Sequence, residues 1–222
     1  MLAGRVRVNG QVVSELGTRV VPGRDVVALD GVVVSMPPEI WLAFHKPAGV
    51  LTTRDDPHAG ATIYDSLPAE HAGLRYVGRL DKDAEGLLLL TNDGDGAHAV
   101  QHPSGAVERE YRAEVAGRIE AAVVRRLLGG VELEDGPARA HHAEIVEAGS
   151  VTSTLDLVLT EGRKREVRRM MSVVGHPVLR LRRTRFGPVR LGDLRPGEFR
   201  ELEEAEVEAL LGEAVPRGAR GA

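Results

Sequence analysis

The sequence predicts an α+β fold in which strands outnumber helices, and three observations support this prediction. Segments such as 107–115 alternate polar and apolar residues with the period of two that is typical of a half-buried strand. Residues 87–90 are four consecutive leucines followed by Asn92-Asp93-Gly94, which indicates a buried strand that ends in a tight turn. Only short segments, such as 166–174, show the i, i+3, i+4, i+7 spacing of a helix face. We therefore expect a strand-rich fold with about three to five helices.

The length and composition are typical of a globular protein with a sizeable core. The chain has 222 residues, of which 42% are hydrophobic, enough for one domain and a small appendage. It contains no cysteine, which excludes disulfides and thiolate metal sites. An apolar run of about 18 residues and a signal-peptide pattern are both absent from the sequence. We therefore expect a cytoplasmic protein without a membrane partner.

The first 36 residues read as a small strand-rich unit. Residues 5–8 alternate, and the Asn9-Gly10 pair that follows is a strong hairpin signal. About 36 residues are too few for an independent core. Two consecutive prolines within 36–39 indicate an extended linker. The predicted organisation is a unit over 1–36, a main domain over 37–214 and a disordered tail over 215–222.

The main domain is predicted to alternate strands and short helices. The expected strands are the apolar half of 40–53, residues 107–115, two or three strands within 131–160 with turns at Gly136-Pro137 and 148–150, and a strand pair over 178–191 turned at Gly187-Pro188. The expected helices are 62–67, 95–101, 120–128, 166–174 and 203–211.

Positive charge is concentrated in one part of the chain. The net charge of −4 taken alone argues against nucleic acid, but residues 161–195 contain eleven basic and three acidic residues, an excess of eight positive charges. This excess is consistent with an RNA-phosphate surface, and a merely solvated strand is the alternative. The candidate RNA-binding residues are Arg79, Lys46, Arg163, Lys164, Arg165, Arg169, Arg182, Arg183 and Arg185.

Asp81 is the candidate catalytic residue, because its loop leads directly into the buried leucine strand. An acidic surface loop is an equally simple interpretation of the same pattern. Asp81, Asp83, Glu85 and Gly86 also fit the first positions of a calcium loop. Leucines and an asparagine occupy the later ligand positions, however, so we do not expect calcium.

Two further side chains are candidates for the same site. On the predicted helix 166–174, Arg168 borders the apolar stripe, whereas Arg165 and Arg169 point more toward solvent. An arginine drawn inward needs an anionic partner. Tyr111 lies on the strand 107–115, where it is either a half-buried packing residue or part of the site.

A metal site is not expected at His141-His142. Adjacent residues of a strand point to opposite faces, and no carboxylate lies at ligand spacing from the pair.

Several of these segments together resemble one protein family. Gly78-Arg79-Leu80-Asp81 and then Gly86-Leu-Leu-Leu-Leu-Thr-Asn-Asp-Gly94 resemble the catalytic motif of the RsuA/RluB/RluE/RluF family of ribosomal RNA pseudouridine synthases, and within it the RluB type. Lys46-Pro47-Ala48-Gly49 matches a second motif. The resemblance extends over 40–205. It implies the pseudouridine synthase fold, a long, mostly antiparallel mixed sheet with flanking helices and a central cleft.

The resemblance also implies roles for the candidate residues. Asp81 would attack the ribose anomeric carbon or assist glycal formation, Tyr111 would stack on the flipped uracil, and Arg168 would pair with Asp81. Arg79 and the Arg-rich strand pair would hold phosphates. The expected partner is ribosomal RNA, from the large subunit (23S), or a pre-ribosomal particle. The expected protein is a monomer that needs no metal and no other cofactor.

Four positions depart from the family pattern. His45 stands where Asn is usual, Ala84 where Thr or Ser is usual, Arg109 where Lys is usual, and Glu166 where Gln is usual. These departures leave open a non-catalytic rRNA-binding assembly factor on the same fold. A glycoside hydrolase that uses Asp81 and Glu85 is a third possibility.

The N-terminal unit has a resemblance of its own. Residues 1–36 resemble the second half of the small αL RNA-binding module, which normally begins with two helices. We expect a truncated module of this type or a hairpin unit that binds nothing.

Overall fold

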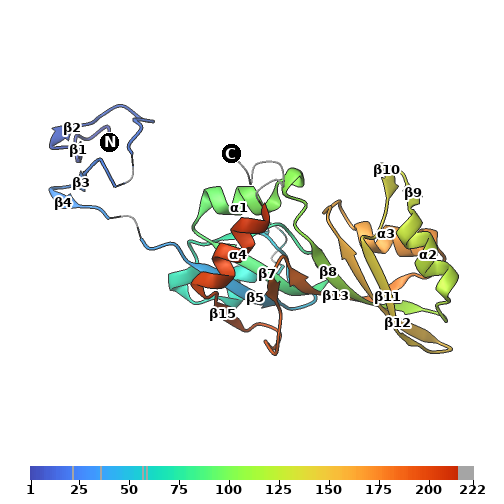
Figure 1. Cartoon of the computed structure of the whole chain (residues 1–222). Coiled ribbons are helices and arrows are strands. Elements are labelled where there is room, and N and C mark those ends of the chain that lie inside the picture. The colour runs from blue at the N-terminus through green and yellow to red at the C-terminus, as the bar shows by residue number, and fades with distance from the viewer. Residues whose placement is uncertain (22, 36, 57, 59, 215–222) are drawn as a thin grey trace. The chain divides into compact units, whose positions relative to one another are not determined.

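The structure is a computed structural model that describes residues 1–214 except 22, 36, 57 and 59. The chain forms two compact units, residues 1–39 and the chain from Ile40 onward (Figure 1). The tail predicted over 215–222 lies outside the described residues.

The N-terminal unit is a four-stranded antiparallel sheet with the strand order β2-β1-β3-β4. Its strands are β1 (Val6–Val8), β2 (Gln11–Val12), β3 (Val27–Leu29) and β4 (Val32–Val33). Asn9 and Gly10 both have positive φ, 50° and 81°, as a two-residue hairpin turn requires. The described residues of this unit are all exposed or only half-buried, which agrees with the expectation that so short a segment lacks a core.

The second unit is built on one large sheet with the order β11-β12-β8-β13-β7-β5-β15, to which β14 adds on β13 and β6 on β7. All strand pairs are antiparallel except β7 with β13. The long, mostly antiparallel mixed sheet is therefore confirmed. The strands are β5 (Trp41–Lys46), β6 (Arg75–Val77), β7 (Glu85–Thr91), β8 (Arg109–Ala116), β11 (His142–Ala148), β12 (Thr152–Leu159), β13 (Val178–Phe186), β14 (Val189–Arg190) and β15 (Phe199–Glu201).

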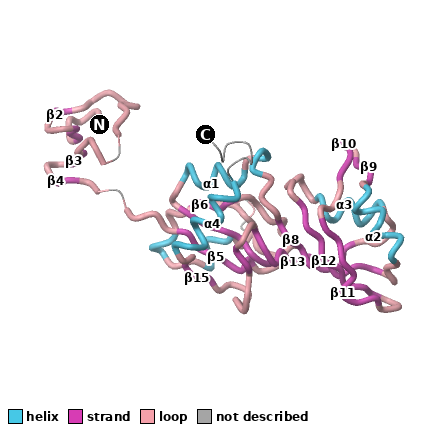
Figure 2. Tube along the Cα trace, in the orientation of Figure 1, coloured by secondary structure: helices cyan, strands magenta, loops and turns pink. Residues whose placement is uncertain are grey.

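Helices pack on both halves of this sheet. The α-helices are α1 (Gly94–Gln101), α2 (Ala121–Gly129), α3 (Glu166–Val173) and α4 (Glu204–Ala214), and the short 3₁₀ turns are η1 (Ile63–Ser66), η2 (Ala69–His71) and η3 (Pro103–Gly105). Helices α1 and α4 lie beside each other over the half that contains β5 and β7, whereas α2 and α3 lie at the half that contains β11 and β12 (Figures 1 and 2).

The region 131–160 contains four strands rather than the two or three predicted. A separate hairpin of β9 (Val131–Leu133) and β10 (Gly136–Ala138) precedes β11 and β12. Gly136 and Pro137 lie in β10, and the turn is one step earlier. Strands of three residues are too short for alternation to show in the sequence. The short strands β6 and β15 were missed for the same reason.

The leucine strand β7 separates two cores, as its composition predicts. Leu88 and Leu90 enter the core that also contains Phe44, whereas Leu87 and Leu89 enter the core on the other face. All four leucines are fully buried. The site loop before β7 is therefore attached to the most rigidly packed strand of the sheet.

The parallel contact between β7 and β13 occurs at Gly86. Only Glu85 and Gly86 of β7 pair with β13, through Arg182 and Arg183. Gly86 has φ +108°, and a Cβ there would overlap the carbonyl oxygen of Arg183 and lie 2.7 Å from its nitrogen. The close approach of the two strands therefore requires glycine.

Replacing Gly86 with alanine is expected to destabilise the protein strongly. Strand separation and the unfavourable φ together should cost about 3 kcal/mol of unfolding free energy or more. Urea unfolding measures this change. Gly94→Ala is the control, because a Cβ there meets nothing within 4 Å and should leave stability nearly unchanged. Equal stability of the two variants would contradict the close contact.

Candidate active site

Asp81 lies on the loop 78–84, which joins β6 to β7. The Ala84 N–H donates to the Asp81 carbonyl at 3.1 Å and closes a turn at the start of β7. The side chains of Leu80 and Ala84 are buried in the core. Between them the side chain of Asp81 remains 30% exposed and that of Asp83 50% exposed. Two apolar anchors thus hold a loop whose carboxylates stay accessible.

Lys46 binds this loop from inside the protein. Its Nζ donates to the carbonyls of Ala84 at 2.7 Å, Pro47 at 2.8 Å and Lys82 at 3.4 Å, and the side chain is fully buried. The Gly49 N–H also donates to the Lys82 carbonyl, at 2.7 Å. The ammonium group of Lys46 is therefore enclosed by the loop it supports, and the contact of Lys46 with RNA stays a prediction.

Burial changes the acidity of this lysine. It lowers the pKa of Lys46 from 10.5 to about 8, and the carboxylates of Asp83, Asp81 and Glu85 offset part of the effect. Lys46 is thus a buried amine whose pKa lies much closer to neutral pH than the pKa of a solvated lysine.

Two arginines from the α3 region reach the same loop. Arg165 Nη1 lies 3.0 Å from Asp83 Oδ1 and 3.9 Å from Asp81 Oδ2. Arg168 Nη2 lies 3.2 Å from Asp83 Oδ2 and donates to the Asp83 carbonyl at 3.0 Å, while Nη1 donates to the Val178 carbonyl at 3.1 Å. Arg165 therefore contacts both Asp83 and Asp81, whereas the ion pair of Arg168 is with Asp83.

The predicted partner of Arg168 needs correction. Arg168 is drawn inward as expected, with its side chain 11% exposed against 44% for Arg165 and 28% for Arg169. Its carboxylate partner in the structure is Asp83, and the arginine that pairs with Asp81 is Arg165, at 3.9 Å. The helix spacing predicts which arginine turns inward, but it does not say which of two carboxylates on a tight turn receives it.

Tyr111 lies in a transverse row of residues beneath this loop. The row crosses four neighbouring strands, β5, β7, β13 and β8, as Lys46, Gly86, Arg183 and Tyr111 in register. Tyr111 is half-buried and packs against the core that also contains Leu80 and Ala84. The candidate tyrosine and the two apolar anchors of the Asp81 loop therefore belong to the same core.

Most arginines of the basic segment bind carboxylates of the protein itself. The pairs are Arg180 and Arg182 with Glu85, Arg185 with Glu108 and Glu110, and Arg163 and Arg169 with Asp135. These four acidic partners lie outside the segment, which is why a count within 161–195 overstates its free charge; Arg163 also contacts Glu161 and Glu166 inside it. RNA contacts by Arg163, Arg165, Arg169, Arg182 and Arg185 stay predictions, and each would compete with a partner in the protein.

Arg183 is buried, and its contact with RNA stays a prediction. The residue is only 2% exposed, and its Nε donates to the Leu87 carbonyl at 2.7 Å. Its guanidinium lies over Phe186 at 5.2 Å from the ring centre, and that of Arg109 lies over the same ring at 4.8 Å. Arg183 therefore packs within the sheet rather than facing solvent.

Glu166 stabilises the turn before α3. It is buried, accepts the Arg163 N–H at 3.1 Å and lies 3.5 Å from Arg163 Nε. Burial raises the pKa of Glu166, and hydrogen bonding to the Arg163 backbone opposes this. The contacts of this carboxylate are thus with its own turn.

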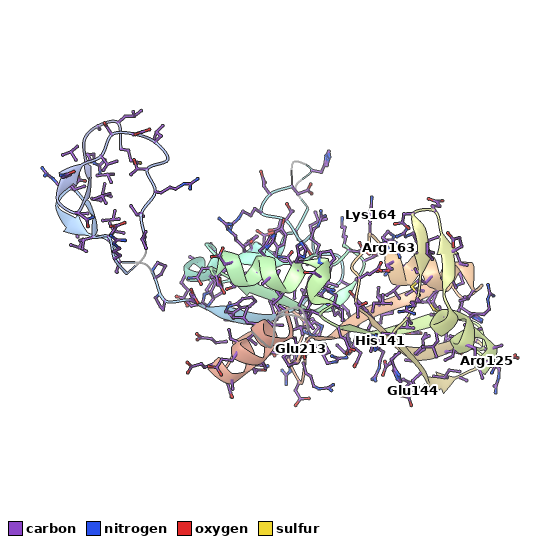
Figure 3. All side chains as sticks on the ribbon, turned by 45° about the horizontal axis from the view of Figure 1, so that its top comes forward. Arg125, His141, Glu144, Arg163, Lys164 and Glu213 are labelled. Atoms are coloured by element: carbon purple, nitrogen blue, oxygen red, sulfur yellow. The ribbon has the colours of Figure 1, made fainter. Side chains whose placement is uncertain are left out.

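Three exposed cations lie close in the sequence to Asp81 or to Arg165, namely Arg79, Lys82 and Lys164. They make no ion pair among the described residues, and all three are exposed. Lys164 directly precedes Arg165, and with Arg163 it lies near the β9–β10 hairpin (Figure 3). These side chains are free to contact phosphates.

Two kinds of feature are absent from the part of the chain that the structure describes. No group of three or more His, Asp or Glu side chains there is arranged to hold a metal ion. No described helix is long and apolar enough to cross a membrane.

Residues 40–173, which include the loop of Asp81, Tyr111 and the whole of α3, match the family described as RNA pseudouridylate synthase. The chain belongs to this family. The family membership predicted from the motifs is therefore confirmed, and as a pseudouridine synthase the protein is an isomerase that acts on RNA.

Full-length relatives agree with this assignment. The chain is 43% identical over 217 residues to an uncharacterised RNA pseudouridine synthase of Mycobacterium leprae, covering 96% of this chain and 85% of the relative. It is 44% identical over 196 residues to the ribosomal large subunit pseudouridine synthase B of Vibrio cholerae, covering 85% of this chain and 60% of the relative. A crystal structure of a pseudouridylate synthase superposes with a TM-score of 0.71 at 28% identity, covering 94% of this chain and 90% of the other.

Sequence reasoning missed the contacts of Asp83. The residue was considered only as a calcium ligand, although its position two residues after Asp81 on a tight turn places it beside that carboxylate. The signal that could have found it is charge pairing between the loop and the Arg-rich start of α3.

The buried Lys46 predicts a specific pH dependence of stability. Because the pKa falls from 10.5 to about 8 on folding, the unfolded chain binds more protons at this residue between those values. The unfolding free energy should therefore rise with pH in this range relative to a Lys46→Met variant, by at most about 1.4 kcal/mol per pH unit.

Urea unfolding of both proteins at about pH 8, 9 and 10 measures this difference. Other titrating groups cancel in the comparison. A stability gap that does not change with pH would contradict the buried ammonium group.

Proposed function

We propose that this synthase isomerises uridine to pseudouridine in ribosomal RNA of the large subunit. Relatives named ribosomal large subunit pseudouridine synthase B support this substrate class. The observation that carries the catalytic proposal is the placement of Asp81, a partly exposed carboxylate on a loop that Lys46 supports from inside. Arg165 Nη1 lies 3.9 Å from its Oδ2.

The reaction rearranges one nucleotide. The bond between uracil N1 and ribose C1′ breaks, the uracil turns, and a bond forms between C5 and C1′. The proton leaves C5, and N1 ends protonated. Because no electrons and no atoms other than protons are exchanged with another molecule, we propose no redox cofactor and no group carrier.

Asp81 is the proposed catalytic carboxylate. It either adds to C1′ to form a covalent sugar ester or assists elimination across C1′ and C2′ to a glycal. Both routes need an ionised carboxylate that is aimed at the sugar. A fixed orientation of Asp81 is supported by its buried neighbours Leu80 and Ala84 and by the hydrogen bonds from Lys46 to the loop.

Tyr111 and the free cations complete the proposed site. A target uridine that is paired or stacked must be flipped out, at a cost of a few kcal/mol. The half-buried Tyr111 is proposed to stack on the flipped base and to assist proton removal. Arg79 and Lys164 are proposed to hold the neighbouring phosphates, together with Lys82, which the sequence did not single out.

The test is a pseudouridine map of ribosomal RNA by carbodiimide treatment and primer extension. A deletion strain is complemented with the native gene or with Asp81→Asn, and we expect one or two modified positions to return only with the native gene. In purified form the variant should lose at least about 10³-fold in rate. Asp193→Asn, an exposed carboxylate on the loop after β14, is the control and should restore the map.

Full modification by Asp81→Asn would refute the catalytic proposal. An rRNA map that is identical with and without the native gene, accompanied by altered ribosome profiles, would favour an assembly factor instead. Modification confined to small-subunit RNA would keep the reaction and change the substrate.

A further inference from the structure

Asp83 is the point at which the Asp81 loop and the α3 region are joined. Its carboxylate accepts hydrogen bonds from both terminal nitrogens of the Arg165 guanidinium, at 3.0 to 3.4 Å, and lies 3.2 Å from Nη2 of Arg168. These contacts bridge positions more than 80 residues apart in the sequence. Asp81 by contrast has Arg165 at 3.9 Å, beyond hydrogen-bond distance.

Arg165 holds an unusual backbone conformation at this junction. Its φ of 52° and ψ of 32° lie in the left-handed region, where a residue with a side chain loses about 1–2 kcal/mol. It stands at the N-cap of α3 without a side-chain cap bond of its own. The ion pair with Asp83 offsets part of this strain and fixes the direction of the guanidinium.

We propose that Asp83 is a positioning residue, which holds the Arg165 guanidinium beside Asp81 but out of direct contact with it. This inference rests on the proposed function of Asp81. A guanidinium at this distance supplies positive charge next to the reacting carboxylate. At the same time the Asp81 oxygens stay free to approach C1′, because the guanidinium N–H groups are already bound to Asp83.

Apart from Asp81 itself, the described carboxylate closest in sequence to Asp83 is Glu85, which cannot take its place without giving up a partner. Glu85 is engaged by Arg180 and Arg182, at 2.8 and 2.7 Å. Lys46 is bound to backbone carbonyls beneath the loop. In an Asp83→Asn variant, Arg165 and Arg168 are therefore expected to turn to Asp81 or to RNA phosphates.

The proposal separates catalysis from binding. Asp83→Asn should lower the single-turnover rate of pseudouridine formation by about 10- to 100-fold, because the guanidinium and the loop lose their fixed relation. RNA affinity should stay equal or become tighter, and its salt dependence should steepen by up to about one charge, because a negative charge is removed and arginines are released. Asp83 itself is half exposed, so the loss of its ion pairs should leave the variant folded.

Asp135→Asn is the matched control. Asp135 binds Arg169 of the same helix at 2.7 and 2.9 Å, so the substitution removes the same charge and releases an arginine away from the loop. This control should keep the native rate. Asp83→Glu restores the charge and should recover part of the rate. Combining Asp83→Asn with Arg165→Gln should be no slower than Arg165→Gln alone, since both act through one interaction.

A native rate for Asp83→Asn would overturn the proposal. A rate and an RNA affinity that fall together with the unfolding midpoint would overturn it too, because they indicate a structural role only. Failure of the proposed function looks different: Asp81→Asn would then form pseudouridine at the native rate, or the native protein would form none.

Discussion

The loop that carries Asp81 depends on one buried ammonium group, that of Lys46. Removing a cation from water costs several kcal/mol unless its hydrogen bonds are replaced. Lys46 donates hydrogen bonds to three carbonyls, two of them in the loop. Its burial is therefore favourable only when the loop has this conformation. Because Lys46 and Gly86 are paired across β5 and β7, the lysine can lie there only if the sheet is in register. The carboxylate is thus positioned by the core of the protein.

The arginines on the outer side of the loop are held by carboxylates of the protein rather than left in solvent. Asp83, Asp135 and Glu85 each bind two arginines that come from α3, the turn before it or β13. Most arginines of the segment 161–195 therefore form ion pairs that join elements of the fold. A protein with a net charge of −4 can still present cations to RNA at a few selected positions, and the unpaired Lys82 and Lys164 flank the Asp83–Arg165 contact.

The sequence predicts the elements with strong local patterns and the family, but not the pairing of charges. The leucine strand, the Asn9-Gly10 hairpin and α3 follow from periodicity and turn chemistry, and the motifs around Asp81 and Lys46 identify the family. The sequence does not predict the burial of Lys46 and Arg183, since a lysine or arginine in a sequence gives no sign of its burial. Arg168 pairs with Asp83 rather than Asp81 because of differences of a few ångströms in the tertiary structure. The periodicity of a helix does not contain this information.

The central claim, that the Asp81 loop is held in place before RNA binds, is tested most directly by amide hydrogen exchange. In NMR spectra of the free protein, the Ala84 N–H, bonded to the Asp81 carbonyl, and the Gly49 N–H, bonded to the Lys82 carbonyl, report on the loop. We predict that both exchange as slowly as the amides of β7, and that RNA leaves their rates unchanged. Fast exchange in the free protein that becomes slow only with RNA would contradict this account.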